Sequence, residues 1–161
     1  MFDTIQKDLK TGLRGKIVVL GVGNPLRSDD GFGSILASRL KDKVSAVVIN
    51  AESAPENHLN RLVNEKADTI LILDAADFEG KPAQIKLLDP RQAMKLLHFS
   101  THNLPLSIIV EFLEYNCKAK VLFLAMQPKS INFGEKLSVE VENKVKLLEK
   151  LLLKLLPKPN N

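Results

Sequence analysis

Apolar residues in this chain follow two alternating patterns, short continuous runs and longer segments with helical spacing. The continuous runs are rich in Val, Ile and Leu and predict buried strands over residues 16–21, 44–50, 68–75, 83–88 and 120–126. The other segments predict helices over residues 1–13, 30–40, 53–64, 89–97 and 139–156, and one from the loop 100–105 to about residue 115. Strands that alternate with helices are typical of an α/β fold, so we expect a three-layer domain with a mostly parallel sheet between helices.

The loop after the first predicted strand carries the strongest local signal. The apolar run ends at glycines, the chain turns through Asn24-Pro25, and two adjacent acids, Asp29 and Asp30, precede the next helix. Ligands of open α/β sheets bind at loops of this kind, beyond the carboxyl ends of the strands. Asp29 and Asp30 are therefore candidate site residues. Aspartate is also among the best helix N-caps, so a purely structural capping role stays open for either residue.

This loop lacks the two phosphate-binding patterns that glycine-rich strand–helix turns often carry. The dinucleotide fingerprint Gly-x-Gly-x-x-Gly requires its third glycine at the position of Leu26. The P-loop requires Gly-Lys-Ser/Thr at the start of the helix, where this chain has Asp30-Gly31-Phe32. Carboxylates at a helix N-terminus would also repel a phosphate group. The loop is better suited to a cation, or to a water molecule held by a carboxylate.

Two further polar residues complete a candidate metal-ligand set with Asp30. Asp74 ends the third strand and, if strands one and three are neighbours in a parallel sheet, it meets Asp30 at the same edge. His102 lies in the polar loop before the following helix. Two carboxylates and one imidazole suit a borderline divalent ion such as zinc or nickel. Structural alternatives stay open, because Asp74 could cap a turn and His102 could be a solvated loop side chain.

Length and composition favour one domain over residues 1–161, with residues 1–14 as an N-terminal extension and residues 157–161 as a tail. A chain of 161 residues with 45% apolar content can bury a substantial core. It has no run of about eighteen apolar residues and begins with a charged segment, so we expect no membrane span, no secretory signal and a cytoplasmic location. The one cysteine, Cys117, excludes an intramolecular disulfide and a thiolate zinc site.

The positive charge of the chain does not predict a nucleic-acid-binding protein. The formal net charge is +4, and much of the excess lies near the chain ends, including lysines expected on the solvated face of the Leu-rich last helix. One tyrosine and no tryptophan offer little for base stacking. We therefore expect no nucleic-acid partner.

Five short motifs occur in an order that resembles one known family. They are Gly21-Val22-Gly23-Asn24-Pro25-Leu26-Arg27-Ser28-Asp29-Asp30-Gly31, Ser53-Ala54-Pro55-Glu56-Asn57, Leu73-Asp74-Ala75, Ser100-Thr101-His102-Asn103-Leu104-Pro105-Leu106 and Gln127-Pro128. The chain resembles the nickel–iron hydrogenase maturation endopeptidases of the hydrogenase-3 type from about residue 16 to residue 156. It departs from the family at Asn50-Ala51-Glu52, where an Asp-Gly-Gly-like turn is frequent, and loss of glycine there narrows the available backbone conformations.

The resemblance implies a twisted five-stranded sheet between helices and a single proteolytic cut. The substrate partner would be the precursor of the hydrogenase large subunit, from which a C-terminal extension is removed after nickel insertion. By match to the family motifs, Asp30, Asp74 and His102 would be the catalytic residues and would contact the nickel already loaded in that precursor. The nickel would thus be supplied by the substrate, and no permanently bound cofactor is expected. The oligomeric state is not predicted.

Two alternative functions remain open from the sequence. The same three ligands could hold a zinc ion tightly in a self-contained metallohydrolase of a small substrate. The chain could instead be a non-catalytic binding module that docks on a maturation partner through its basic last helix.

Overall fold

The protein folds around one central sheet, and a computed structural model describes residues 2–96, 106–134 and 136–160. The strands are β1 (Ile17–Val22), β2 (Val47–Glu52), β3 (Thr69–Ala75), β4 (Ile85–Leu88) and β5 (Lys120–Met126), in the sheet order β2-β1-β3-β5-β4. Adjacent strands are parallel except for β4, which pairs antiparallel with β5 at one edge. The expected α/β fold with a mostly parallel, five-stranded sheet is confirmed.

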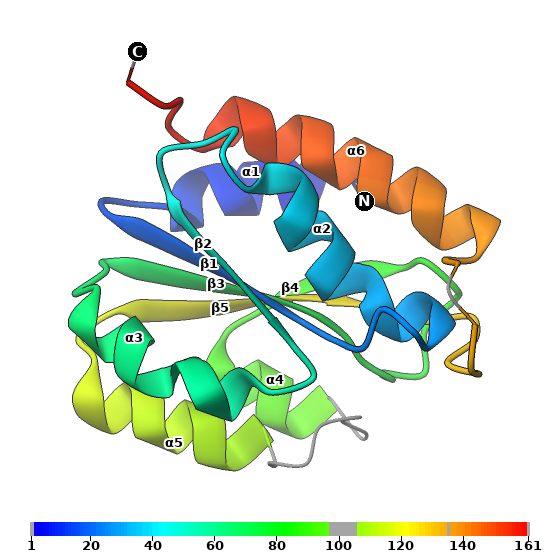
Figure 1. Cartoon of the computed structure of the whole chain (residues 1–161), viewed down its shortest axis with the longest axis horizontal. Helices are drawn as coiled ribbons and strands as arrows, with labels where there is room; N and C mark the ends of the chain where they lie inside the picture. Colours follow the sequence, from blue (N-terminus) through cyan, green and yellow to red (C-terminus); the bar gives the residue numbers. More distant parts are fainter. Residues whose placement is uncertain (1, 97–105, 135, 161) are drawn as a thin grey trace.

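Helices cover both faces of this sheet (Figure 1). One face carries α1 (Phe2–Gly12), α2 (Phe32–Leu40) and α6 (Val139–Leu155), and the other carries α3 (Leu59–Asn64), α4 (Pro90–Leu96) and α5 (Leu106–Asn116). Two short 3₁₀ turns, η1 (Ser28–Gly31) and η2 (Pro55–His58), precede α2 and α3. None of the described helices is long and apolar enough to cross a membrane.

The parallel strands are buried on both faces, which explains their continuous apolar runs. Successive side chains point to opposite faces of the sheet. Val19 and Leu71 belong to the apolar cluster beneath α1, α2 and α6, whereas Val18 and Ile70 belong to the cluster beneath α3 and α5. Two separate hydrophobic cores therefore pack against the two faces of the sheet and hold its edges in place.

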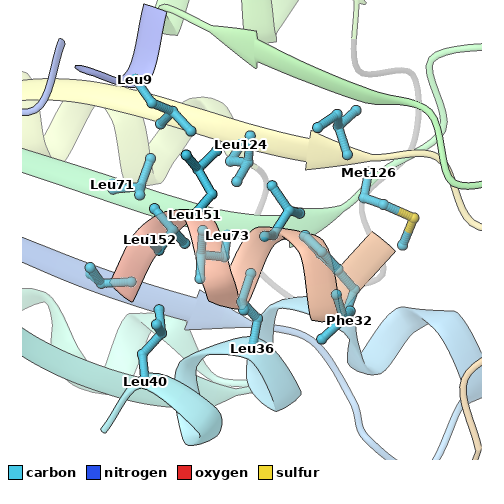
Figure 2. Packing of buried hydrophobic residues seen from close by; sticks show 14 of the residues in the cluster. Leu9, Phe32, Leu36, Leu40, Leu71, Leu73, Leu124, Met126, Leu151 and Leu152 are labelled. Carbon is cyan, nitrogen blue, oxygen red and sulfur yellow. The ribbon is translucent and has the colours of Figure 1, made fainter. Parts of the chain in front are cut away.

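The N-terminal helix α1 is part of the first core. Figure 2 shows Leu9 of α1, Leu36 of α2 and Leu152 of α6 directed toward the sheet, where Leu71 and Leu73 lie on β3. Leu9 is fully buried, with 0% of its surface exposed. The segment predicted as an N-terminal extension thus contributes buried side chains to the layer that covers β1, β3 and β5.

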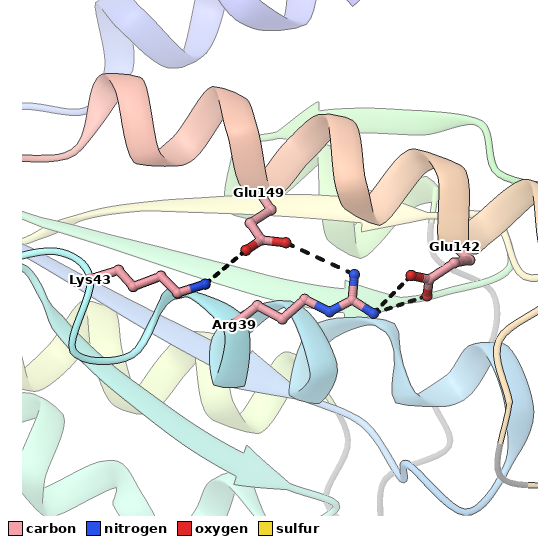
Figure 3. Close-up of polar contacts among 4 residues, drawn as sticks. All are labelled: Arg39, Lys43, Glu142 and Glu149. Carbon is pink, nitrogen blue, oxygen red and sulfur yellow. Dashed lines mark hydrogen bonds and ion pairs between the residues drawn. The ribbon is translucent and has the colours of Figure 1, made fainter.

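A polar cluster links α2 to α6 along their more exposed sides (Figure 3). The Arg39 guanidinium lies 2.9 Å from Glu142 Oε1 and 3.9 Å from Glu149 Oε2. Lys43 Nζ lies 3.1 Å from the other oxygen of Glu149. Because these side chains are partly exposed, the link contributes modestly to stability.

Several predicted element boundaries are wrong. The fourth strand begins at Ile85 rather than residue 83, and the helix predicted from residue 53 begins with the 3₁₀ turn η2 and becomes α-helical at Leu59. The second strand begins at Val47 rather than residue 44, because Val47 is the first residue that pairs with β1 and the Ser45 N–H donates instead to the Pro157 carbonyl (2.8 Å). The helix predicted from residue 30 begins at Phe32. It is preceded by η1, whose first residue, Ser28, has a φ of 48° that an α-helix does not allow.

Candidate functional site

The candidate site lies at the carboxyl edge of the sheet, where β1 and β3 end. The two strands are parallel neighbours, with Gly21 paired opposite Leu73. This is the arrangement in which Asp30 and Asp74 were expected to meet. Asp30 lies in η1, which contacts β3, and Asp74 is the last residue but one of β3. Both are buried, with 1% and 8% of their surfaces exposed. The structure therefore brings these two carboxylates to the same edge.

Two glycines allow η1 and α2 to approach the strand ends this closely. Gly23 has a φ of 140°, and a methyl group there would overlap the Asp30 carbonyl oxygen. A methyl group at Gly33 would overlap the carbonyl oxygens of Leu73 and Val22. The absence of side chains at these positions is thus what places Asp30 against the ends of β1 and β3.

The loop between β1 and η1 is shaped by hydrogen bonds that end on Asn24 and Asp30. The Asn24 N–H donates to Asp30 Oδ2 (3.0 Å), and the Leu26 N–H donates to Asn24 Oδ1 (2.9 Å). The N-cap of α2 is Gly31, and no side chain caps that helix. The capping alternative for Asp30 is therefore not what the structure shows.

Asp29 has a different role from its neighbour, and sequence reasoning missed it. Its carboxylate is fully buried (0% exposed) and binds the loop between β5 and α6. Oδ1 accepts from the Ser138 N–H (2.7 Å), and Oδ2 accepts from the N–H groups of Lys129 (2.8 Å) and Ser130 (3.1 Å) and from Ser138 Oγ (2.9 Å). Asp29 thus binds Ser138, the residue that precedes α6, and does not cap α2.

Gln127 organises the other side of the edge. It directly follows β5 and is buried, with 8% of its surface exposed. Its Oε1 accepts from the N–H groups of Phe78 (2.9 Å) and Gly80 (3.0 Å), and its Nε2 donates to Asp77 Oδ1 (3.1 Å). Gln127 therefore holds the turn that follows Asp74. The signals in the sequence were a polar residue at the end of an apolar strand and the family motif Gln127-Pro128, neither of which names its partners.

The third predicted ligand, His102, lies outside the described residues. Within residues 2–96, 106–134 and 136–160, no group of three His, Cys, Asp or Glu side chains could hold a metal ion. The described part of the site thus supplies two buried carboxylates. Cys117 lies beyond the end of α5, and burial raises the pKa of its thiol, so it is a poor nucleophile at neutral pH.

Comparisons with known proteins identify the family of the chain. A family model described as hydrogenase maturation protease, HycI, matches residues 33–155. The hydrogenase 3 maturation protease of Escherichia coli K12 is 35% identical over 118 residues, which cover 72% of this chain and 75% of that protein.

Solved structures give the same result. The crystal structure of a [NiFe] hydrogenase maturation protease HycI from Thermococcus kodakarensis has a TM-score of 0.81 at 28% identity and covers 91% of this chain and 97% of that one. The solution structure of an endopeptidase HycI from Escherichia coli has a TM-score of 0.75 at 30% identity and covers 84% of this chain and 88% of that one. The chain therefore belongs to the HycI family of hydrogenase maturation proteases, which are endopeptidases.

Proposed function

We propose that this endopeptidase removes the C-terminal extension of a nickel–iron hydrogenase large-subunit precursor after nickel has been inserted. The observation that carries the proposal is the pair of buried carboxylates, Asp30 and Asp74, at the carboxyl edge of a chain from this family. Nickel enters the proposal through the family resemblance and through the similarity to the [NiFe] hydrogenase maturation protease HycI of Thermococcus kodakarensis. In the proposal the substrate is a metal-loaded protein.

Recognition of nickel would occur through Asp30, Asp74 and His102. Carboxylate oxygens and an imidazole nitrogen are suitable ligands for a borderline divalent ion. Buried carboxylates attract a cation more strongly than exposed ones, because less water screens their charge. In this proposal the nickel is part of the substrate, and only a loaded precursor completes the set of contacts. Cleavage would then report that nickel insertion has finished.

The reaction is hydrolysis of one peptide bond. A water molecule attacks the scissile carbonyl carbon, the carbon–nitrogen bond breaks, and the proton from water passes to the leaving amine. Nickel can polarise the scissile carbonyl, and either nickel or a carboxylate can activate the water. The products are the mature carboxyl terminus and the free extension.

Exposed apolar side chains beside the two carboxylates support a protein substrate. Leu26 and Phe133 are 49% and 83% exposed. They lie on two loops that are joined by a hydrogen bond from the Gly134 N–H to the Leu26 carbonyl (2.9 Å). Large apolar side chains exposed near a site are typical of a surface that binds another macromolecule.

The test is cleavage of a purified, nickel-loaded large-subunit precursor, followed by mass spectrometry. The proposal predicts a product shortened by a single C-terminal peptide. An intact precursor after incubation with the enzyme would contradict it. Stoichiometric zinc in the purified enzyme, together with an intact precursor, would instead favour a self-contained metallohydrolase.

A further inference from the structure

Asp29 joins two loops that are about one hundred residues apart in the sequence. Its own N–H donates to the Ser130 carbonyl (3.0 Å), in addition to the hydrogen bonds that its carboxylate accepts. Beside it, the Ser28 N–H donates to the Gly134 carbonyl (2.8 Å). We call the Asp29 carboxylate with Lys129, Ser130 and Ser138 the Asp29 clasp. The clasp fixes η1 against the β5–α6 loop.

The chemistry of the clasp requires a carboxylate. The groups that reach Asp29 are backbone N–H groups and one hydroxyl, which all donate. Its negative charge also lies at the N-terminus of the 17-residue helix α6, where the helix dipole stabilises an anion. Asparagine has the same shape, but its NH₂ group would face one of the N–H donors. That donor would then have no acceptor.

The position of the clasp connects it to the reaction. Asp30 follows Asp29 directly within the same 3₁₀ turn. Several contacts hold this turn: Asp29 and the Ser28 N–H join it to the β5–α6 loop, and the Asn24 N–H binds the Asp30 carboxylate from the preceding loop. The β5–α6 loop carries the exposed Phe133, which lies on the surface assigned to the protein substrate. Any movement at Asp29 would thus shift Asp30 relative to that surface.

We propose that Asp29 is a positioning residue of the peptidase, which holds the Asp30 carboxylate in register with the β5–α6 loop. This inference rests on the proposed function, since it takes Asp30 to be a nickel contact. Asp29 itself touches neither nickel nor the scissile bond. It acts by holding η1, so its removal should lower the rate of cleavage more than the affinity for the precursor.

The test compares kcat and KM for the nickel-loaded precursor in the wild type and in Asp29→Asn. We expect kcat to fall about 10- to 100-fold, because small misplacements of a catalytic group cost this much, while KM changes far less. Amide hydrogen exchange at Lys129, Ser130 and Ser138 should become faster in the same variant.

The matched control is Glu142→Gln, which breaks the exposed link between the same two helices, α2 and α6. It should keep the wild-type kcat, so a loss limited to Asp29→Asn cannot come from weaker packing of these helices. If Asp29→Asn does not fold, Ser138→Ala decides the question. It removes only the hydroxyl donor and should lower kcat several-fold.

The outcomes separate the two proposals. No cleavage by the wild type would overturn the proposed function. Cleavage by the wild type with an unchanged kcat in Asp29→Asn, or in a folded Ser138→Ala where the first variant is unfolded, would overturn only the positioning role. A lower kcat with faster exchange at the clasp amides supports it.

Discussion

The two edges of the sheet use the same residue type in opposite ways. At the carboxyl edge, Asp29 is fully buried (0% exposed) and binds a loop from a distant part of the chain. At the amino edge, Asp68 is exposed, and its Oδ2 accepts from the N–H of Lys16, the residue before β1 (2.7 Å). Water partly solvates the charged carboxylate of Asp68, whereas only protein groups stabilise the charged carboxylate of Asp29. A buried charge thus marks the edge of the sheet at which the positions of the side chains matter most.

The amino edge has a hollow, but it lacks the chemistry of a reactive site. A hollow of about 490 Å³ lies at the amino edge and is lined by Val63, Lys66, Ala67, Asp68, Asn116, Cys117 and Lys118. Burial raises the pKa of the Cys117 thiol in this hollow, so little thiolate forms at neutral pH. The carboxyl edge, by contrast, gathers two buried acids, Asp30 in η1 and Asp74 in β3, at the ends of neighbouring strands. The buried carboxylates therefore distinguish the carboxyl edge from the amino edge.

The largest effect is expected from the candidate nickel contacts. Asp30→Ala, Asp74→Ala and His102→Ala should each abolish cleavage of the nickel-loaded precursor, while cooperative thermal unfolding is retained. His58→Ala is the matched control, because His58 lies in η2 outside the predicted ligand set. Normal cleavage in any one of the three variants would remove that residue from the site.

The next largest effect concerns packing at the carboxyl edge. Gly33→Ala should lower the free energy of unfolding by about 3 kcal/mol, because the new methyl group meets backbone carbonyl oxygens that cannot move aside. Gly12→Ala is the control near the amino edge, since its methyl group would lie 2.9 Å from the flexible tip of Leu122. Chemical denaturation measures both variants. Equal losses would show that close packing is not special to the carboxyl edge.

A smaller effect is expected from the exposed aspartate. Asp68→Asn should lower the free energy of unfolding by about 1 kcal/mol at most, since the amide oxygen of asparagine can still accept from the Lys16 N–H and only the charge is lost. Cleavage of the precursor should be unchanged. Denaturation and the cleavage assay together check this prediction. A loss of cleavage activity as large as that of Asp29→Asn would contradict the proposed difference between the amino edge and the carboxyl edge.

The smallest effect concerns the departure from the family at Asn50-Ala51-Glu52. Glu52 has a φ of 50°, and its carbonyl accepts from the Gly23 N–H (2.6 Å). Glu52→Gly should raise the free energy of unfolding by about 0.5 kcal/mol, because relief of the left-handed conformation exceeds the added entropy of the unfolded chain. The control Lys41→Gly, at a φ of −56°, should be destabilising. Destabilisation of similar size in both variants would contradict this account.

Much of the architecture could be predicted from the pattern of apolar residues. The strand over residues 120–126 has the predicted bounds, because a strand buried on both faces gives an uninterrupted apolar run. The loop that carries Asp30 and the strand that carries Asp74 were also predicted, and their meeting required only that β1 and β3 be neighbours. Residues at the ends of parallel strands are thus accessible to sequence reasoning.

The roles of Asp29 and Gln127 could not be predicted in the same way. Each binds backbone groups of a loop that is distant in sequence, and backbone N–H groups are present at nearly every residue. No pattern of residue types therefore marks the partner of such a side chain. The start of β2 was missed for a similar reason, because only pairing with β1 defines it. The position of His102 lies outside the described residues and stays a prediction.

The most direct test of the central claim compares two forms of the same precursor. Purified enzyme is incubated with large-subunit precursor that carries nickel and with precursor that lacks it, and the products are analysed by mass spectrometry. The account predicts cleavage of the nickel-loaded form alone, because only that form completes the contacts with Asp30, Asp74 and His102. Equal cleavage of both forms would keep the peptidase and contradict the recognition of nickel.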